Sequence, residues 1–95
     1  MTRYRITKQA GEDLEAIWLY IAEDNPSVAD RVLDTLQEKF RLLGKHPQMG
    51  RSRKDLGETL RSLPVEKYVV IYRYRNECVE IIHVIHGARD IPSLL

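Results

Sequence analysis

Two β-strand patterns near the C-terminal end, joined by a tight-turn signal, constrain the fold of this chain more than any other feature. Apolar and aromatic residues fill most positions of the two runs, Tyr68–Arg73 and Val79–Ile85. Between them lies Asn76-Glu77, where asparagine tolerates positive φ, so we expect an antiparallel hairpin. A chain of 95 residues has room for one modest core, which predicts a single domain over residues 1–95.

The first half of the chain shows helical periodicity after a short strand pattern. Tyr4 and Ile6 alternate with arginines, which predicts a short N-terminal strand with one buried face. Apolar residues then recur at helical spacing, and this predicts a first helix from about Lys8 to Glu23. Thr7 is the expected N-cap of that helix.

The dipeptide Asn25-Pro26 predicts an abrupt change from one helix to the next. Proline disfavours helical geometry in the residue before it and is favoured as the first residue of a helix, with Asn25 as N-cap. One apolar stripe follows, made of Val28, Ala29, Val32, Leu33, Leu36, Phe40 and Leu43. Gly44 is expected to end this helix as a left-handed cap ahead of Pro47. The two helices should therefore form a hairpin.

A loop and a third short strand complete the expected fold. Residues 46–58 have no periodicity, and the segment around Leu60–Val65 predicts a strand that Pro64 either ends or moves to a sheet edge. With the hairpin, this strand makes an antiparallel meander. We therefore expect an α+β fold of order β-α-α-β-β-β, in which the helical hairpin packs on a small, mostly antiparallel sheet.

Charge is distributed unevenly along the chain, although the formal net charge is only +1. Residues 8–38 hold eight acids against two bases, whereas residues 39–61 hold seven bases against two acids. A positive surface of this kind suits an acidic partner or a phosphate backbone. A second interpretation is that these Lys and Arg residues lie in solvent at the C-terminal end of a helix, where their positive charges complement the helix dipole.

Several classes of function have no support in the sequence. It contains no glycine-rich phosphate loop and no nucleophile elbow, and no apolar run approaches the roughly 18 residues that span a bilayer. The single cysteine, Cys78, cannot form an internal disulfide, which fits a reducing compartment. We therefore expect a cytoplasmic protein with no cofactor and no membrane partner.

The histidines do not predict a metal site. His83 and His86 lie three residues apart on a predicted strand, so their side chains should point to opposite sheet faces. Sharing one ion would require the strand to end between them. His83 is interpreted as a sheet residue with satisfied hydrogen bonds.

A basic constellation is the main candidate for binding a target. It consists of Arg51, Arg53, Arg61, His86 and Arg89. A loop, a short strand and the tail of the last strand can converge at one sheet edge. There these basic side chains would bind phosphate groups. A ribonuclease would also need a general acid and a general base. The nearby candidates are Glu58, Glu66 and His86, and none has an evident partner to shift its pKa. The other interpretation is ordinary surface charge.

Five short motifs then follow one another along nearly the whole chain. They lie within residues 10–21, 26–29, 47–56, 68–73 and 80–90, and the last contains His86-Gly87-Ala88-Arg89-Asp90. In this order they resemble the ParE family of the RelE/ParE toxin superfamily. The resemblance implies a bacterial toxin of a type II toxin–antitoxin module, held in a hetero-oligomeric complex with a ParD-like antitoxin.

The resemblance implies one of two mechanisms. RelE-like members cut messenger RNA on the ribosome, whereas ParE-like members are associated with poisoning DNA gyrase. Arg61 and Arg89 could stand at basic positions of the nuclease branch, but the tail Ile91–Leu95 has no tyrosine, lysine or histidine to complete an acid–base pair. The resemblance therefore favours a gyrase-directed inhibitor that acts by binding, with no catalytic residues. A ribosome-dependent mRNA endoribonuclease is the alternative, and an interaction domain without toxicity is a third interpretation.

Two aromatic residues of the first helix are candidates for binding the antitoxin. An amphipathic antitoxin segment could lie over Trp18 and Tyr20. For Trp18 the spacing with Leu14 and Ile21 favours a place in the core over a place in an interface.

Overall fold

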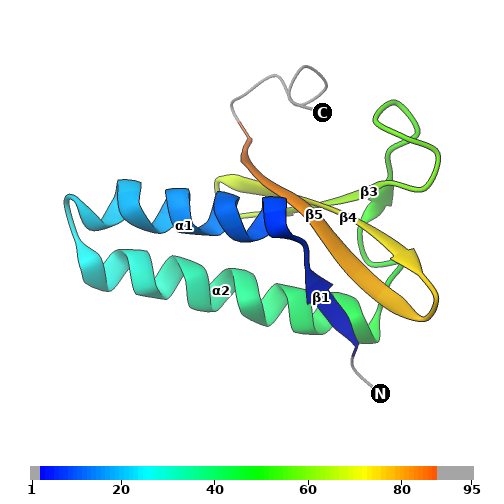
Figure 1. The fold of residues 1–95 in the computed structure, drawn as a ribbon, viewed down its shortest axis with the longest axis horizontal. Coiled ribbons are helices and arrows are strands. Elements are labelled where there is room, and N and C mark those ends of the chain that lie inside the picture. Colours follow the sequence, from blue (N-terminus) through cyan, green and yellow to red (C-terminus); the bar gives the residue numbers. More distant parts are fainter. Residues whose placement is uncertain (1–2, 88–95) are drawn as a thin grey trace.

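Two helices pack side by side against a five-stranded sheet in the computed structural model, which describes residues 3–87 (Figure 1). The elements in chain order are β1 (Tyr4–Ile6), α1 (Lys8–Ala22), α2 (Pro26–Lys45), β2 (Arg51–Ser52), β3 (Arg61–Val65), β4 (Tyr68–Arg75) and β5 (Cys78–His86). The strand order is β1-β5-β4-β3-β2, parallel between β1 and β5 and antiparallel elsewhere. The predicted α+β class and its order of elements are confirmed.

Both predicted helix starts are confirmed by their caps. The Thr7 hydroxyl accepts the backbone N–H three residues later at 3.3 Å and donates to the Ile81 carbonyl at 2.7 Å, so the α1 cap also ties the helix to β5. The Asn25 side chain accepts the N–H groups two and three residues later at 3.1 and 3.2 Å, and Pro26 is the first residue of α2. The connection between the helices is therefore only three residues long.

The end of α2 corrects one expectation. Gly44 does not form a left-handed cap: α2 continues through Lys45, and no glycine within residues 3–87 has positive φ. The cap is His46, with φ −131° and ψ 74°, outside the helical region. A following proline disfavours helical geometry in the residue before it, so Pro47 rather than Gly44 stops the helix.

The core lies between the helical layer and the sheet. Its buried members are Ala10, Leu14, Val32, Leu36, Phe40, Leu43, Val65, Val70, Tyr72, Val79, Ile81 and Val84. The predicted stripe of α2 supplies four of them, but Val28 at its start is exposed. Val70 and Tyr72 of β4 face the helices, so the residues between and beyond them face the opposite side, which we call the outer face of the sheet.

The meander has one predicted turn and one unexpected strand. Asn76 and Glu77 both have positive φ, 55° and 60°, as the two-residue turn requires. The segment predicted as loop contains β2, which pairs with only the first two residues of β3. Pro64 lies further along β3, past the end of β2, where its missing N–H costs no ladder hydrogen bond.

Candidate functional site

Arg61, a candidate for target binding, is fixed to the backbone of the preceding loop. Its Nε and Nη2 donate to the Gly50 carbonyl at 3.0 and 2.6 Å, and Nη2 also donates to the Gln48 carbonyl at 3.3 Å. A guanidinium with these acceptors holds the loop against the start of β3. Arg61 therefore has a structural role in addition to its charge.

The same loop is held from the core side by Tyr72. The buried Tyr72 hydroxyl donates to the Pro47 carbonyl at 2.7 Å and accepts the Gly50 N–H at 2.9 Å. These bonds satisfy two backbone groups that would otherwise be buried without partners. The segment that leads into Arg51 thus has a defined position on the sheet.

Arg51 and Arg53 lie together on the outer face beside β3. Arg51 is exposed and pairs in register with Ser62, whose side chain also accepts a 3.3 Å hydrogen bond from Arg53. Arg53 forms two further bonds, of 3.0 and 2.9 Å, with the carboxylate of Asp55. That pairing raises the pKa of Arg53 and lowers the pKa of Asp55. Asp55 therefore offsets part of the positive charge here.

His86 does not join these arginines. It pairs in register with Tyr68 at one end of β4 and packs edge-on against that ring, with centroids 5.6 Å apart. Arg61 pairs with Tyr72, four residues further along the same strand, or about 13 Å at ~3.3 Å per residue. Of the set expected to converge at one sheet edge, Arg51 and Arg53 share the outer face there, whereas Arg61, in register with Tyr72, lies on the helix-facing side of the same edge. His86 lies away from all three, and Arg89 lies outside the described residues.

A second group of arginines, which the sequence analysis missed, surrounds a buried carboxylate on the outer face. The Glu80 side chain is 5% exposed; it accepts bonds from Arg5 and, at 2.5 Å, from Arg73 Nε, and Arg75 Nη2 lies 3.4 Å from its Oε1. We call these four residues the Glu80 cluster. The bonds from Arg73 and Arg5 lower the pKa of Glu80 from its ordinary value of 4.5 to about 2.

Part of the Glu80 cluster could have been found in the sequence. A two-residue turn at Asn76-Glu77 fixes the hairpin register and places Arg73 opposite Glu80. The place of Arg5 could not be found this way, because it depends on the parallel pairing of β1 with β5.

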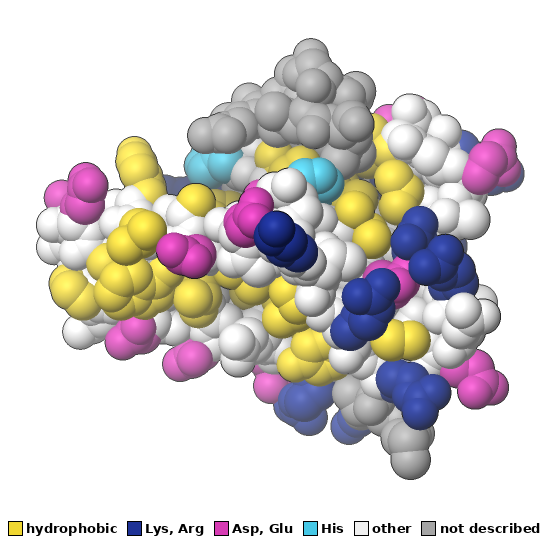
Figure 2. Space-filling model, viewed as in Figure 1, with side chains coloured by type: hydrophobic (Ala, Val, Ile, Leu, Met, Phe, Trp, Pro, Cys, Tyr) yellow, Lys and Arg dark blue, Asp and Glu magenta, His cyan; other side chains and the backbone are white. Residues whose placement is uncertain are grey.

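The two aromatic candidates of α1 differ in their surroundings. Trp18 is half-buried, and its Nε1 donates to Asp30 of α2 at 2.8 Å, so it links the two helices. Tyr20 is 79% exposed. Two further exposed apolar residues, Leu19 and Val28, also lie near the helix connection, and Figure 2 shows hydrophobic side chains gathered over this end of the helices. We call Leu19, Tyr20 and Val28 the helical tip patch.

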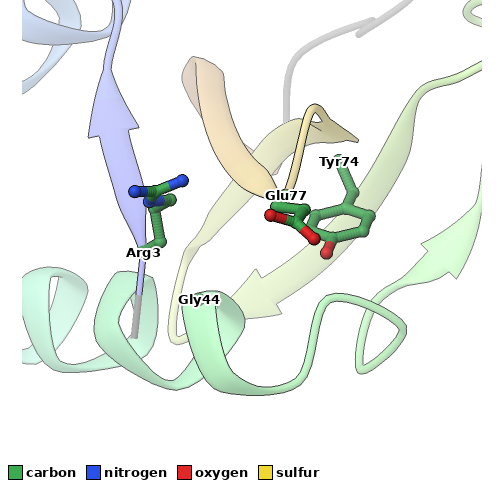
Figure 3. Close-up of a pocket in the computed structure, with 4 residues that line it drawn as sticks. All are labelled: Arg3, Gly44, Tyr74 and Glu77. Carbon is green, nitrogen blue, oxygen red and sulfur yellow. The ribbon is translucent and has the colours of Figure 1, made fainter. Parts of the chain in front are cut away.

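Two open hollows flank the exposed ring of Tyr74. The larger, of about 340 Å³, is lined by Arg3, Gly44, Tyr74 and Glu77, and Figure 3 shows Tyr74 and Glu77 beside each other across from Arg3. The smaller, of about 270 Å³, is lined by Pro47, Gln48, Ser52, Glu58, Thr59, Leu60, Arg61 and Tyr74. Both open to solvent, unlike the concave sites that bury most of a small ligand.

His83 has the ordinary role predicted for it. Its Nδ1 lies 3.0 Å from Asp13 Oδ2, which also accepts the Val84 N–H at 3.0 Å. Asp13 thereby attaches α1 to β5 where β1 has ended. Across residues 3–87, no three His, Cys, Asp or Glu side chains are grouped to hold a metal ion, and no helix is long and apolar enough to cross a membrane.

Comparisons with known proteins place these features in a family. The family model described as ParE toxin of type II toxin–antitoxin system, parDE, matches residues 4–91. Toxin ParE3 of Caulobacter vibrioides is 30% identical over 96 residues, covering 100% of this chain and 96% of its own. Toxin ParE1 of the same organism is 33% identical over 97 residues, covering 100% and 99%.

Solved structures share the fold. A chain from the chromosomal ParDE toxin–antitoxin system of P. aeruginosa has a TM-score of 0.76 and 21% identity, with 90% of this chain and 96% of that chain covered. A chain from the toxin–antitoxin complex RelBE2 of Mycobacterium tuberculosis has a TM-score of 0.63 and 22% identity, with the same shares covered. Both structures have the helical hairpin and meander architecture in common with this chain.

Proposed function

Because the chain belongs to the ParE toxin family of type II toxin–antitoxin systems, we propose that it binds DNA gyrase in the cytoplasm and traps the enzyme on cleaved DNA. Gyrase as the target is supported by family membership. Binding, rather than catalysis, is supported by the arrangement of the candidate cations in the structure.

The choice of binding over catalysis depends on the hydrogen bonds that the Arg61 guanidinium makes. Phosphoryl transfer needs cations aimed at the charge that develops on the phosphate. The Arg61 guanidinium instead donates to the Gly50 and Gln48 carbonyls, and Arg53 is paired with Asp55. A rigid basic edge of this kind is better suited to holding a partner than to catalysing cleavage.

The helical tip patch is proposed as the surface that the antitoxin covers. Exposed apolar side chains at the end of a helical hairpin are typical of interfaces. A ParD-like antitoxin would lay the apolar face of an amphipathic segment over Tyr20 and its neighbours. Trp18, two residues before Tyr20 on α1, is held by its hydrogen bond to Asp30 of α2.

Tyr20→Ala and Trp18→Ala are expected to separate affinity from stability. Tyr20→Ala should weaken antitoxin binding about tenfold or more without changing the melting temperature, because its ring is already in solvent. Trp18→Ala should lower the stability of the free toxin by ~1–3 kcal/mol, since it loses packing and the hydrogen bond to Asp30. Calorimetric titration and thermal melts measure both. An unchanged antitoxin affinity for Tyr20→Ala would remove this patch from the interface.

Expression of the chain without antitoxin tests the choice of target in cells. A gyrase poison should leave broken chromosomal DNA in arrested cells and leave messenger RNA intact. Coding-region cuts in messenger RNA without DNA breaks would contradict the proposal and support the ribosome-dependent endoribonuclease. Co-expression of the antitoxin should abolish the arrest in either case and thus serves as the control.

A further inference from the structure

We propose that the outer face of the sheet, centred on the Glu80 cluster, contacts the phosphate backbone of duplex DNA. The inference deepens the proposed function and rests on it, because a toxin that traps gyrase on cleaved DNA acts within reach of that DNA. It assigns a ligand to a surface that lies apart from both the helical tip patch and Arg61.

Charge separates the two layers of the protein. Five arginines share the outer face: Arg5, Arg51, Arg53, Arg73 and Arg75. The acids beside them are Glu80 and Asp55. In the helical layer, residues 8–45, acids outnumber bases by eight to five. Figure 2 shows Lys and Arg side chains grouped around an acidic one over the sheet, and acidic side chains spread along the helices.

This separation selects the face that a polyanion would approach. A nucleic acid is repelled by the acidic helices and attracted by the outer face, so the field of the whole protein orients the encounter. The net charge of only +1 means that attraction comes from the arrangement of charges and not from their total.

Glu80 holds the arginines of its cluster in place. Its carboxylate is nearly buried and ionised, and it takes bonds from Arg73 and Arg5 while Arg75 lies close by. One negative charge faces three positive ones, so the cluster keeps a net positive charge. A guanidinium that is already positioned loses less side-chain entropy when it binds an anion.

The free sides of these guanidinium groups fit phosphate. Arg5 and Arg75 are 56% and 55% exposed, and each directs only its Nη2 at Glu80. Their remaining N–H groups are available for the two-pronged hydrogen bonding that phosphate oxygens favour. The five cations named above are all arginines, whose planar guanidinium groups suit this mode of recognition.

The test compares two variants with the same change in charge. Arg5→Gln/Arg75→Gln removes two cations of the outer face and keeps the Arg73–Glu80 ion pair. Arg31→Gln/Arg41→Gln, with side chains 60% and 49% exposed on α2, removes two cations of the helical layer. Binding of the antitoxin-free full chain to a fluorescent duplex is followed by anisotropy at several salt concentrations, and thermal melts verify that each variant is folded.

The wild type should bind the duplex at low salt, with affinity that falls as salt rises. The outer-face variant should bind at least about tenfold more weakly, and the slope of log K against log salt should become smaller by about two, one for each lost phosphate contact. The helical variant should stay within about twofold of wild type.

Three results would overturn the inference. They are no duplex binding by folded wild type at low salt, equal losses in both variants, and tighter binding of single-stranded RNA than of duplex DNA through the same arginines. Because gyrase is absent from this experiment, the inference and the proposed function fail separately. Gyrase poisoning without duplex binding would contradict only the DNA-contacting face, and duplex binding without poisoning would contradict only the choice of gyrase.

Discussion

Gly50→Ala is expected to destabilise the protein strongly, because the added Cβ has no room beside the buried ring of Tyr72. The new Cβ would lie 2.6 Å from the Ser62 carbonyl oxygen, 2.6 Å from the Tyr72 hydroxyl and 2.7 Å from Tyr72 Cε1. One neighbour is backbone and the other is a buried ring, so neither can move away easily. Overpacking of this kind costs ~1–3 kcal/mol, and a displaced Tyr72 hydroxyl leaves buried backbone groups unpaired at a further ~1–3 kcal/mol.

Thermal denaturation followed by circular dichroism measures this effect. A loss of about 3 kcal/mol should lower the melting temperature by at least ~12 °C in a domain of this size. Gly11→Ala is the matched control, because nothing lies within 4 Å of its new Cβ on α1. Alanine is the better helix former there, so that variant should gain up to ~1 kcal/mol. A Gly50→Ala protein that melts within 2 °C of wild type, about 0.5 kcal/mol or less, would contradict the packing described around Tyr72.

Glu80→Gln is expected to cost about 2 kcal/mol at pH 7. It removes the buried negative charge that three arginines share and leaves those arginines to repel one another. A fall in the pKa of Glu80 from 4.5 to about 2 corresponds to at most ~3 kcal/mol, and the partly exposed arginines reduce that figure through solvent screening.

The same residue predicts how stability changes with acid. The pKa of Glu80 is lower in the folded protein than in the unfolded chain, so its contribution is fully present above about pH 4.5. That contribution is lost as the pH falls from 4.5 toward 2. The difference between wild type and Glu80→Gln should therefore be large at pH 7 and small near pH 2.5.

Urea unfolding at the two pH values checks this prediction. Glu38→Gln on α2 is the control, because Glu38 also pairs with an arginine and has a lowered pKa, but it is exposed. Exposed pairs of this kind contribute little, so the urea midpoint of this variant should match that of wild type at both pH values. Equal stability of Glu80→Gln and wild type at pH 7 would show that the cluster does not support the fold.

The elements with local signals could be predicted from the sequence. Helix periodicity, the Asn25-Pro26 connection and the turn at Asn76 each depend on a few neighbouring residues, and all three are confirmed. Local signals failed where two of them competed. Gly44 and Pro47 both predict a helix end, and the steric effect of Pro47 on the residue before it prevails.

The sites were harder to predict because they depend on long-range pairing. The separation of His86 from Arg61 follows from the register of β3 and β5 on β4, which no short motif fixes. The role of Arg61 depends on backbone carbonyls, and these have no signature in a sequence. Strand β2 is only two residues long, too short to show any periodicity.

The proposed action on gyrase is tested most directly with purified components. The antitoxin-free chain is incubated with DNA gyrase, relaxed plasmid and ATP, and the DNA is examined for supercoiling and for cleavage. We expect lost supercoiling and linear plasmid, both prevented when the cognate antitoxin is added first. Unchanged supercoiling in the presence of folded toxin would contradict gyrase as the target of this chain.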